Sequence, residues 1–218
     1  MTLTHAIIIR LYFAPDDPRA AWRLDFFEQQ VLPCLARQTC PDFAIWISCH
    51  PAHQERLQAL DPRIRTYQDG AQAEDQVIGL IALAPGKGAL PQVAIQTRHD
   101  SDDLLSKHYV ARIRKEIAKR PDKSLLVSFQ PYKLDLASGQ RYRLATRYHR
   151  QQPSMFLSLY QPDQKNYRYI YECNHRRLWQ ICPRVVTVPE GYCDLVVHGG
   201  NCHTKIGERD RPLIEGKR

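Results

Sequence analysis

The sequence predicts an α/β fold with a mainly parallel sheet, followed by a smaller mixed β region in the C-terminal third. Strand and helix patterns alternate over residues 1–122, whereas short strand patterns dominate after residue 123. A chain of 218 residues buries one good core, so we expect a single domain over residues 1–218. Ligands of such parallel sheets bind at the carboxyl ends of the strands.

Four β-α units are expected in the first half. The predicted strands are apolar runs, and the predicted helices repeat apolar residues at near-helical spacing. Pro33 is expected to kink the first helix, because proline cannot donate a helical hydrogen bond. We expect strands at 5–12, 43–49, 64–67 and 92–97, and helices at 22–37, 52–60, 71–83 and 105–120.

The second half is expected to extend the same sheet rather than form an independent domain. Ser138-Gly139 supplies a turn between the first two of its predicted strands. Small and charged residues from position 201 onward predict a mobile basic tail. We expect strands at 124–129, 141–146, 153–160, 167–171 and 192–197, and a short helix at 174–182.

The formal charge of +8 is concentrated in the last third of the chain. Residues 141–218 hold 14 Lys and Arg against 7 Asp and Glu, whereas residues 1–140 hold 17 against 16. This distribution favours a basic surface facing a polyanion, such as a nucleotide diphosphate, a nucleic acid or an anionic membrane. An arginine-rich solvated surface explains the same excess.

The lack of a recognisable targeting signal, together with the cysteine pattern, predicts a cytoplasmic protein. No apolar run approaches the roughly 20 residues of a membrane span, so no transmembrane segment is expected. The N-terminus has no signal-peptide pattern. The seven cysteines are an odd number without zinc-binding spacing, which indicates reduced thiols.

An acidic segment follows the last strand of the first half. Arg98-His99-Asp100-Ser101-Asp102-Asp103 comes directly after the strand at 92–97, and Leu104-Leu105 is expected to enter the next helix. Capping of a helix N-terminus explains one or two of these carboxylates, but not three. Mg²⁺ and Mn²⁺ bind carboxylates together with substrate phosphates. We therefore favour a metal-diphosphate site over capping alone.

A strand that ends in a D-x-D triplet after four β-α units resembles the GT-A glycosyltransferases, whose fold is Rossmann-like. Other segments resemble the rhamnosyltransferase subgroup of that fold. They span most of the chain in order, and the D-x-D region is the discriminating one. These segments are Ile9-Arg10-Leu11-Tyr12, Phe26-Phe27, Leu32-Pro33-Cys34-Leu35, Gln38-Thr39, Phe43-Ala44-Ile45-Trp46, Thr97 to Asp103, Pro153-Ser154-Met155-Phe156 and Val197-His198-Gly199-Gly200-Asn201.

The resemblance implies a nucleotide-sugar donor, UDP- or dTDP-linked, and a divalent cation, Mn²⁺ or Mg²⁺. It assigns residues 1–122 to the donor, 123–200 to the acceptor and 201–218 to the tail. Asp103 would orient its neighbours. Asp69 would accept a hydrogen bond from the uracil or thymine of the nucleotide, although Asp69-Gly70 also suits a simple turn. The implied metal ligands are Asp100, Asp102 and His198, and the implied donor-binding residues are Arg10, Asp69, Arg98, Asp100 and Lys205.

Sugar transfer also needs a base for the acceptor hydroxyl and positive charge for the leaving diphosphate. Glu172 and His175 are the candidate bases, and Asp194 is a weaker one. Arg98 and the pair Arg176-Arg177 are candidates for stabilising the departing charge. A surface that binds the acceptor, or another polyanion, is expected at Arg147, Arg176 and Arg177.

Two acceptors fit these features. A hydroxymethylated pyrimidine in DNA is slightly favoured by the basic last third and its interleaved tyrosines and arginines, which suit stacking and phosphate contacts. A cell-surface glycan fits the subgroup resemblance. The competing function classes are a metal-dependent nuclease and a non-catalytic nucleic-acid-binding module. The interleaved residues are Tyr142, Arg143, Arg147, Tyr148, Arg150, Tyr160, Tyr167, Arg168, Tyr169 and Tyr171.

Overall fold

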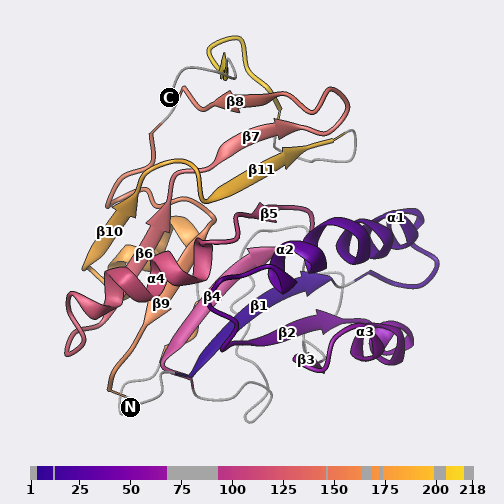
Figure 1. Cartoon of the computed structure of the whole chain (residues 1–218), viewed down its shortest axis with the longest axis horizontal. Coiled ribbons are helices and arrows are strands. Elements are labelled where there is room, and N and C mark those ends of the chain that lie inside the picture. The colour runs from indigo at the N-terminus through magenta and orange to yellow at the C-terminus, as the bar shows by residue number, and fades with distance from the viewer. Residues whose placement is uncertain are drawn as a thin grey trace.

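Two sheets form the framework of this computed structural model, which describes residues 4–11, 13–67, 93–145, 147–163, 168–171, 174–198 and 205–213. Figure 1 shows a large sheet below a small one. The large sheet has the strand order β10-β6-β9-β4-β1-β2-β3, and the small sheet the order β12-β8-β7-β11-β5. The predicted α/β class, with its second mixed β region, is confirmed.

The large sheet is parallel except for β9, which pairs antiparallel with β4 and β6. Strand β1, beside the central strand β4, is almost fully buried on both faces, as expected for a strand covered on either side. Strands from both halves of the chain contribute to it. They are β1 (His5–Leu11), β2 (Ala44–Cys49), β3 (Ile64–Tyr67), β4 (Ile95–Asp100), β6 (Leu125–Phe129), β9 (Leu157–Tyr160) and β10 (Val185–Val188).

The small sheet consists of short strands from the second half together with one from the first. Its members are β5 (Leu104–Leu105), β7 (Tyr132–Asp135), β8 (Arg141–Arg143), β11 (Cys193–Val197) and β12 (Arg211–Pro212). The prediction that Leu104-Leu105 enters a helix is wrong, because these residues pair with β11 instead. The next helix, α4 (Tyr109–Ala118), begins four residues later.

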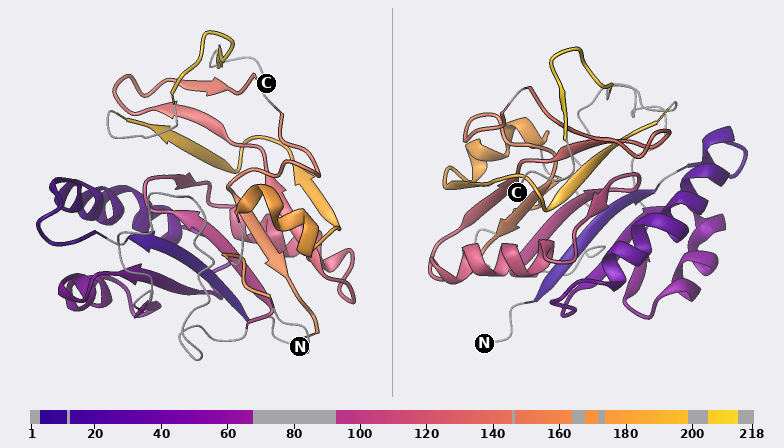
Figure 2. Two further views of the ribbon diagram at one scale, coloured as in Figure 1. Left: turned by 180° about the vertical axis from the view of Figure 1, so that it is seen from behind. Right: turned by 45° about the horizontal axis from the view of Figure 1, so that its top comes forward.

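Helices cover both faces of the large sheet, as the two views from front and back show (Figures 1 and 2). Ile7, Ile9 and Leu11 of β1 belong to the core on the face of α1, α2 and α4, whereas Ala6 and Ile8 belong to the core on the face of α5. The remaining helical segments are α1 (Pro18–Phe26), α2 (Leu32–Ala36), the 3-10 turn Pro51–His53, α3 (Gln54–Leu60), the 3-10 turn His175–Arg177 and α5 (Leu178–Ile181).

The predicted helix at 22–37 begins earlier in the structure and is irregular in its middle. It begins at Pro18, where the carboxylate of Asp17 accepts the Arg19 amide hydrogen at 2.8 Å. A π-helical segment, Phe27–Val31, joins α1 to α2. Pro33 lies just after it and cannot donate the regular helical hydrogen bond, so the helix departs from α geometry on its N-terminal side.

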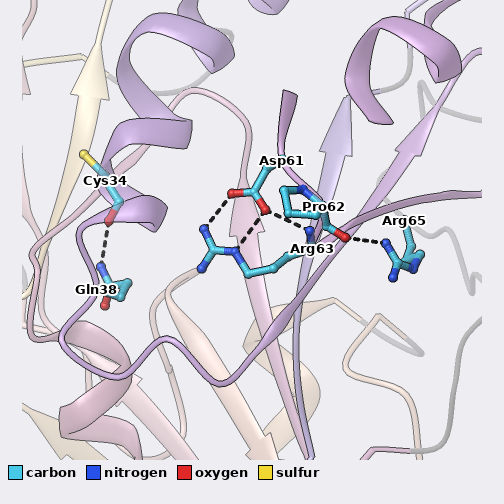
Figure 3. Close-up of polar contacts among 6 residues, drawn as sticks. All are labelled: Cys34, Gln38, Asp61, Pro62, Arg63 and Arg65. Atoms are coloured by element: carbon cyan, nitrogen blue, oxygen red, sulfur yellow. Dashed lines mark hydrogen bonds and ion pairs between the residues drawn. The ribbon is translucent and has the colours of Figure 1, made fainter. Parts of the chain in front are cut away.

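The turn into β3 is held by a short network around Asp61 (Figure 3). Its carboxylate accepts from the Arg63 amide at 2.8 Å and from the Arg63 guanidinium at 3.0 and 2.7 Å. Arg65 donates to the Pro62 carbonyl at 2.7 Å. These contacts fix the turn between α3 and β3, the strand at the edge of the large sheet.

Gln38 connects the end of α2 to α4. Its side-chain nitrogen donates to the Cys34 carbonyl at 3.0 Å (Figure 3) and to the Ser106 carbonyl at 2.7 Å. Its side-chain oxygen accepts from the Val110 amide at 3.0 Å. A buried amide that is satisfied on both sides holds the two helices in fixed register on the sheet.

Several other expectations differ from the structure. The described residues 168–171 are not a strand, and the predicted helix at 71–83 lies outside the described residues. Strands β7, β10 and β12 were not predicted. The turn at Ser138-Gly139 joins β7 to β8 rather than β6 to β8. In the parts of the chain that the structure describes, the five cysteines are all free, and no helix has the length and apolarity to cross a membrane.

Candidate functional site at the carboxyl end of β4

The acidic segment begins inside β4 rather than after it. β4 continues three residues beyond Thr97, and Asp100 lies beside Arg10 of β1 in the parallel register. Side chains alternate between the two faces of a strand, so Arg98 and Asp100 share one face with Arg10, and His99 points to the other. The site is therefore built on the two central strands of the large sheet.

Two arginines surround a buried tyrosine on that face. The guanidinium carbons of Arg10 and Arg98 lie 4.4 and 5.1 Å from the centre of the Tyr171 ring. The Tyr171 hydroxyl donates to the Ile8 carbonyl at 3.0 Å, which fixes the ring against β1. We call Arg10, Arg98 and Tyr171 the arginine cluster. Sequence reasoning missed the place of Tyr171 in it, since no motif connects residue 171 with β1.

The guanidinium groups of the arginine cluster keep hydrogen-bonding capacity. Among the described residues, the buried Nε atoms of Arg10 and Arg98 have no hydrogen-bond partner. A terminal guanidinium nitrogen of Arg98 lies 3.6 Å from a carboxylate oxygen of Asp100, which is longer than a good hydrogen bond. Two partly satisfied cations at a strand end are suited to an anionic group such as a phosphate.

Charge around Asp100 keeps it ionised. Burial alone would raise its pKa, but the positive charges of Arg98 and Arg10 outweigh burial and lower it. The pKa of His175 is also lowered, to about 4, by burial and by the charge of Arg98, and this leaves the imidazole neutral. At neutral pH the site thus combines an ionised carboxylate with a neutral imidazole.

Asp102 faces a different set of partners. It forms an ion pair with Arg23 of α1 and accepts from the His198 ring at 3.0 Å. The His198 ring centre lies 4.4 Å from that of Trp22. We call Arg23, Asp102 and His198 the Asp102 triad. The prediction that Asp102 and His198 lie together is consistent with this contact, but Arg23 was missed, because a lone arginine in a helix carries no motif.

Asp103 connects the acidic segment to the small sheet. Its carboxylate is 2% exposed and accepts from the Val196 amide of β11 at 3.0 Å. Burial raises its pKa well above the usual range, and the charges of Asp102 and Asp100 raise it further. The expected role of Asp103 in orienting its neighbours fits this position, since it joins the turn after β4 to β11.

The described side chains do not form a complete cation site as they stand. No group of three or more His, Cys, Asp or Glu side chains in the described ranges is placed to hold a metal ion. Asp102 and His198 touch, but Arg23 already supplies a positive charge to the same carboxylate. Asp100 is directed toward Arg98. A divalent ion at Asp102 would have to displace the Arg23 guanidinium.

Other predicted site residues lie elsewhere. Asp194 is in β11, where Arg141 donates to it at 2.8 Å and burial raises its pKa. Lys205 is exposed, and its carbonyl accepts from Lys133 at 2.6 Å. Arg147, Arg176 and Arg177 are all exposed, and Arg176 is near enough to His175 to contribute to its lowered pKa. Asp69 and Glu172 lie outside the described residues.

Comparison with known proteins decides the family. The family described as "Putative rhamnosyl transferase" matches residues 4–208. The chain belongs to this rhamnosyl transferase family. No curated protein matched the chain in a sequence search.

Solved structures of S. aureus TarS share the fold of this family member. Residues 1–349 of TarS match with a TM-score of 0.53 and 13% identity over 89% of the chain. The TarS complex with UDP-GlcNAc matches with 0.51 and 11% over 94%, and the complex with UDP with 0.52 and 13% over 89%. The chain spans 60–62% of those TarS chains. At this identity the likeness shows the fold.

Two of the interleaved tyrosines of this rhamnosyl transferase family member are buried rather than part of an exposed stacking surface. Tyr160 and Tyr171 are 3% and 4% exposed, and each hydroxyl donates to a backbone carbonyl. A tyrosine must expose its ring to stack on a base. Both rings belong to the interior of the fold, so the pattern that favoured DNA is weakened.

Proposed function

We propose that this protein is a glycosyltransferase that moves a sugar from a nucleotide-diphosphate sugar, UDP- or dTDP-linked, to a hydroxyl group of a glycan. The observation that carries the proposal is the meeting of an ionised carboxylate, Asp100, with the arginine cluster at the carboxyl end of β4. Family membership and the fold shared with TarS, which has been solved with UDP and UDP-GlcNAc, support it.

The donor diphosphate would bind at the arginine cluster. As the bond between the sugar and the diphosphate breaks, negative charge builds on the leaving oxygen, and the guanidinium groups of Arg10 and Arg98 would stabilise it. The ring of Tyr171 holds both guanidinium groups in place before the donor arrives. Such prior positioning avoids reorganisation during the reaction.

Asp100 and His175 would act beside the diphosphate. The lowered pKa of Asp100 leaves it an acceptor only, which suits a hydroxyl of the ribose or of the sugar. His175 is neutral at neutral pH, so it can take a proton from the acceptor hydroxyl. Glu172 remains the alternative base proposed from the sequence. Asp194 is disfavoured, because its carboxylate is already paired with Arg141.

A divalent cation stays a prediction of the proposal. Asp102 and His198 would hold it after displacement of Arg23, and the cation would supply further positive charge to the diphosphate. If no cation is needed, Arg23 keeps its place at Asp102 and the arginine cluster supplies the charge. The two outcomes differ in whether nucleotide binding depends on the metal.

A glycan acceptor is now favoured over DNA. Membership of the rhamnosyl transferase family supports an acceptor of sugar chemistry, and the buried tyrosines remove part of the argument for base stacking. Exposed arginines such as Arg147 and Arg177 remain available for an anionic glycan as well as for nucleic acid. A metal-dependent nuclease is less well supported, since the carboxylates near β4 face arginines.

Calorimetric titration tests the donor site. We expect UDP or dTDP to bind the wild type, and Arg98→Gln to weaken that affinity about tenfold or more by removing a charge-assisted contact. Arg120→Gln changes an exposed arginine after α4 and should leave the affinity unchanged. Titrations with and without Mn²⁺ decide the role of the cation. If neither nucleotide binds the folded protein under either condition, the proposal is wrong.

A further inference from the structure

A pocket separate from the arginine cluster opens between α1 and the small sheet. Its volume is about 550 Å³, within the roughly 300–1,000 Å³ of small-molecule sites. Helix α1 provides one wall, and the turn after β7 and the end of β11 provide the other. It is lined by Pro18, Arg19, Trp22, Arg23, Asp135, Leu136, Ala137, Val197 and His198.

The pocket collects the exposed apolar side chains of the described structure. Trp22 and Leu136 are the two large hydrophobic residues that stay exposed in the described ranges, at 38% and 40%, and both line this pocket. They come from elements more than 100 residues apart in the chain. The Trp22 indole is held by Phe26, whose ring centre lies 5.2 Å away, and by His198. A fixed, half-exposed indole facing an apolar wall is a stacking platform.

The two arginines at the pocket already have carboxylate partners. Arg19 pairs with Asp17 at 2.7 Å, and Arg23 pairs with Asp102. The Asp135 carboxylate accepts from the Ala137 amide at 3.2 Å and from the Ser138 hydroxyl at 2.6 Å. A phosphate would meet arginines that are already paired and the negative charge of Asp135, whereas a neutral ligand fits an apolar lining with a few polar side chains.

The pocket adjoins the proposed reaction site through the Asp102 triad. Arg23 and His198 line the pocket and also contact Asp102, two residues after Asp100. A ring stacked on Trp22 would therefore lie one side chain away from Asp102. A ligand in the pocket would therefore approach the carboxyl end of β4 from the side of α1.

We propose that this pocket binds a neutral pyranose ring of the glycan acceptor. The axial hydrogens of a pyranose form an apolar face that packs on Trp22, and its equatorial hydroxyl groups would meet the polar groups at the rim and floor. This inference rests on the proposed function, because it places the acceptor beside the donor site. It assigns acceptor binding to α1 and the small sheet, rather than to the exposed arginines.

Fluorine NMR of the full chain labelled with 5-fluorotryptophan tests the pocket directly. Three tryptophans give three signals, and Trp22→Phe identifies the one from Trp22. The probes are methyl β-glucopyranoside and methyl β-N-acetylglucosaminide, with sorbitol as an acyclic polyol and UMP as a nucleotide. We expect at least one pyranoside to shift the Trp22 signal saturably, and to leave the Trp46 and Trp179 signals in place.

Two variants test whether a shift of the Trp22 signal comes from binding in the pocket. Ala137→Phe fills the pocket from the opposite wall and should abolish the shift, whereas Trp179→Phe should preserve it. The inference is overturned if neither pyranoside moves the Trp22 signal of the folded protein, or if sorbitol or UMP moves it equally.

The two experiments distinguish an error in the inference about the pocket from an error in the proposed function. If UDP or dTDP binds in calorimetry while no pyranoside reaches Trp22, only the inference about the pocket is wrong. If a pyranoside reaches Trp22 and neither nucleotide binds, the pocket is a sugar site and the transferase proposal is wrong.

Discussion

Replacement of His5 by glutamine should reverse the order of stability between pH 7 and pH 5. His5 begins β1 and is 3% exposed, and its Nε2 lies 2.7 Å from the Thr97 hydroxyl of β4. That hydroxyl is in turn 2.7 Å from the Ser158 hydroxyl of β9. The chain of contacts crosses the three central strands that position Asp100. Burial, and then the charge of Arg114, lowers the pKa of His5 from 6.5 to about 3.

The magnitude follows from the two pKa values. Neutral His5 contributes stability that is fully present above pH 6.5 and is lost as the pH falls toward 3. At pH 5 nearly every unfolded chain binds this proton and almost no folded chain does, which favours unfolding by about 2 kcal/mol. His5→Gln does not titrate and can still bond to Thr97. We expect it to cost about 1 kcal/mol at pH 7 through its altered contacts.

Urea denaturation at pH 7 and pH 5 measures the effect. The variant should be about 1 kcal/mol less stable than the wild type at pH 7 and about 1 kcal/mol more stable at pH 5. Other buried histidines, such as His99 and His175, titrate in both proteins, so their contributions cancel in the difference. His149→Gln, at an exposed position, should show no such reversal. A difference that stays constant between the two pH values refutes the reasoning.

Three further substitutions test other parts of the structure. Asp102→Asn leaves the partly buried Arg23 without its charged partner and should lower the unfolding free energy by about 2 kcal/mol in urea, with part of the loss recovered by adding Arg23→Met; an unchanged midpoint contradicts the ion pair. Asp210→Ala removes the acceptor of Lys133, Gly207 and Ala145, so amide exchange should accelerate in residues 205–213 and not in β4, and equal acceleration everywhere counts against a local role. Tyr171→Phe loses one hydrogen bond worth about 1 kcal/mol and should retain nucleotide affinity, because the ring remains; lost affinity would place the hydroxyl at the ligand.

The parts of the fold that could be predicted are those with strong local patterns. β1 and β2 are mainly apolar runs, and the bounds of β1, β2 and β3 agree with the prediction within about a residue. Short polar strands such as β8 and β12 gain their stability from partners far along the chain, which no local pattern reveals. Leu104 and Leu105 look like the start of an amphipathic helix, but pairing with β11 overrides that preference.

The site shows the same limit. Asp100, Asp102 and Arg98 could be named from the sequence, because several charged residues follow one buried strand. Their partners could not. Arg23 and Tyr171 reach the carboxyl end of β4 from segments more than 70 residues away in the chain, through packing of α1 and of the segment before α5. From the sequence alone, a metal ion is therefore expected to balance Asp100 and Asp102, which the structure pairs with arginines.

Turnover of the donor tests the central claim most directly. The wild type and Arg98→Gln would be incubated with a panel of UDP- and dTDP-linked sugars, with and without a glycan acceptor, and the released nucleotide diphosphate measured by mass spectrometry. We predict that the wild type releases UDP or dTDP from at least one donor, faster with acceptor, and that Arg98→Gln releases it at least tenfold more slowly. Equal release by both proteins, or none by the folded wild type from any donor, would contradict a transferase site at the arginine cluster.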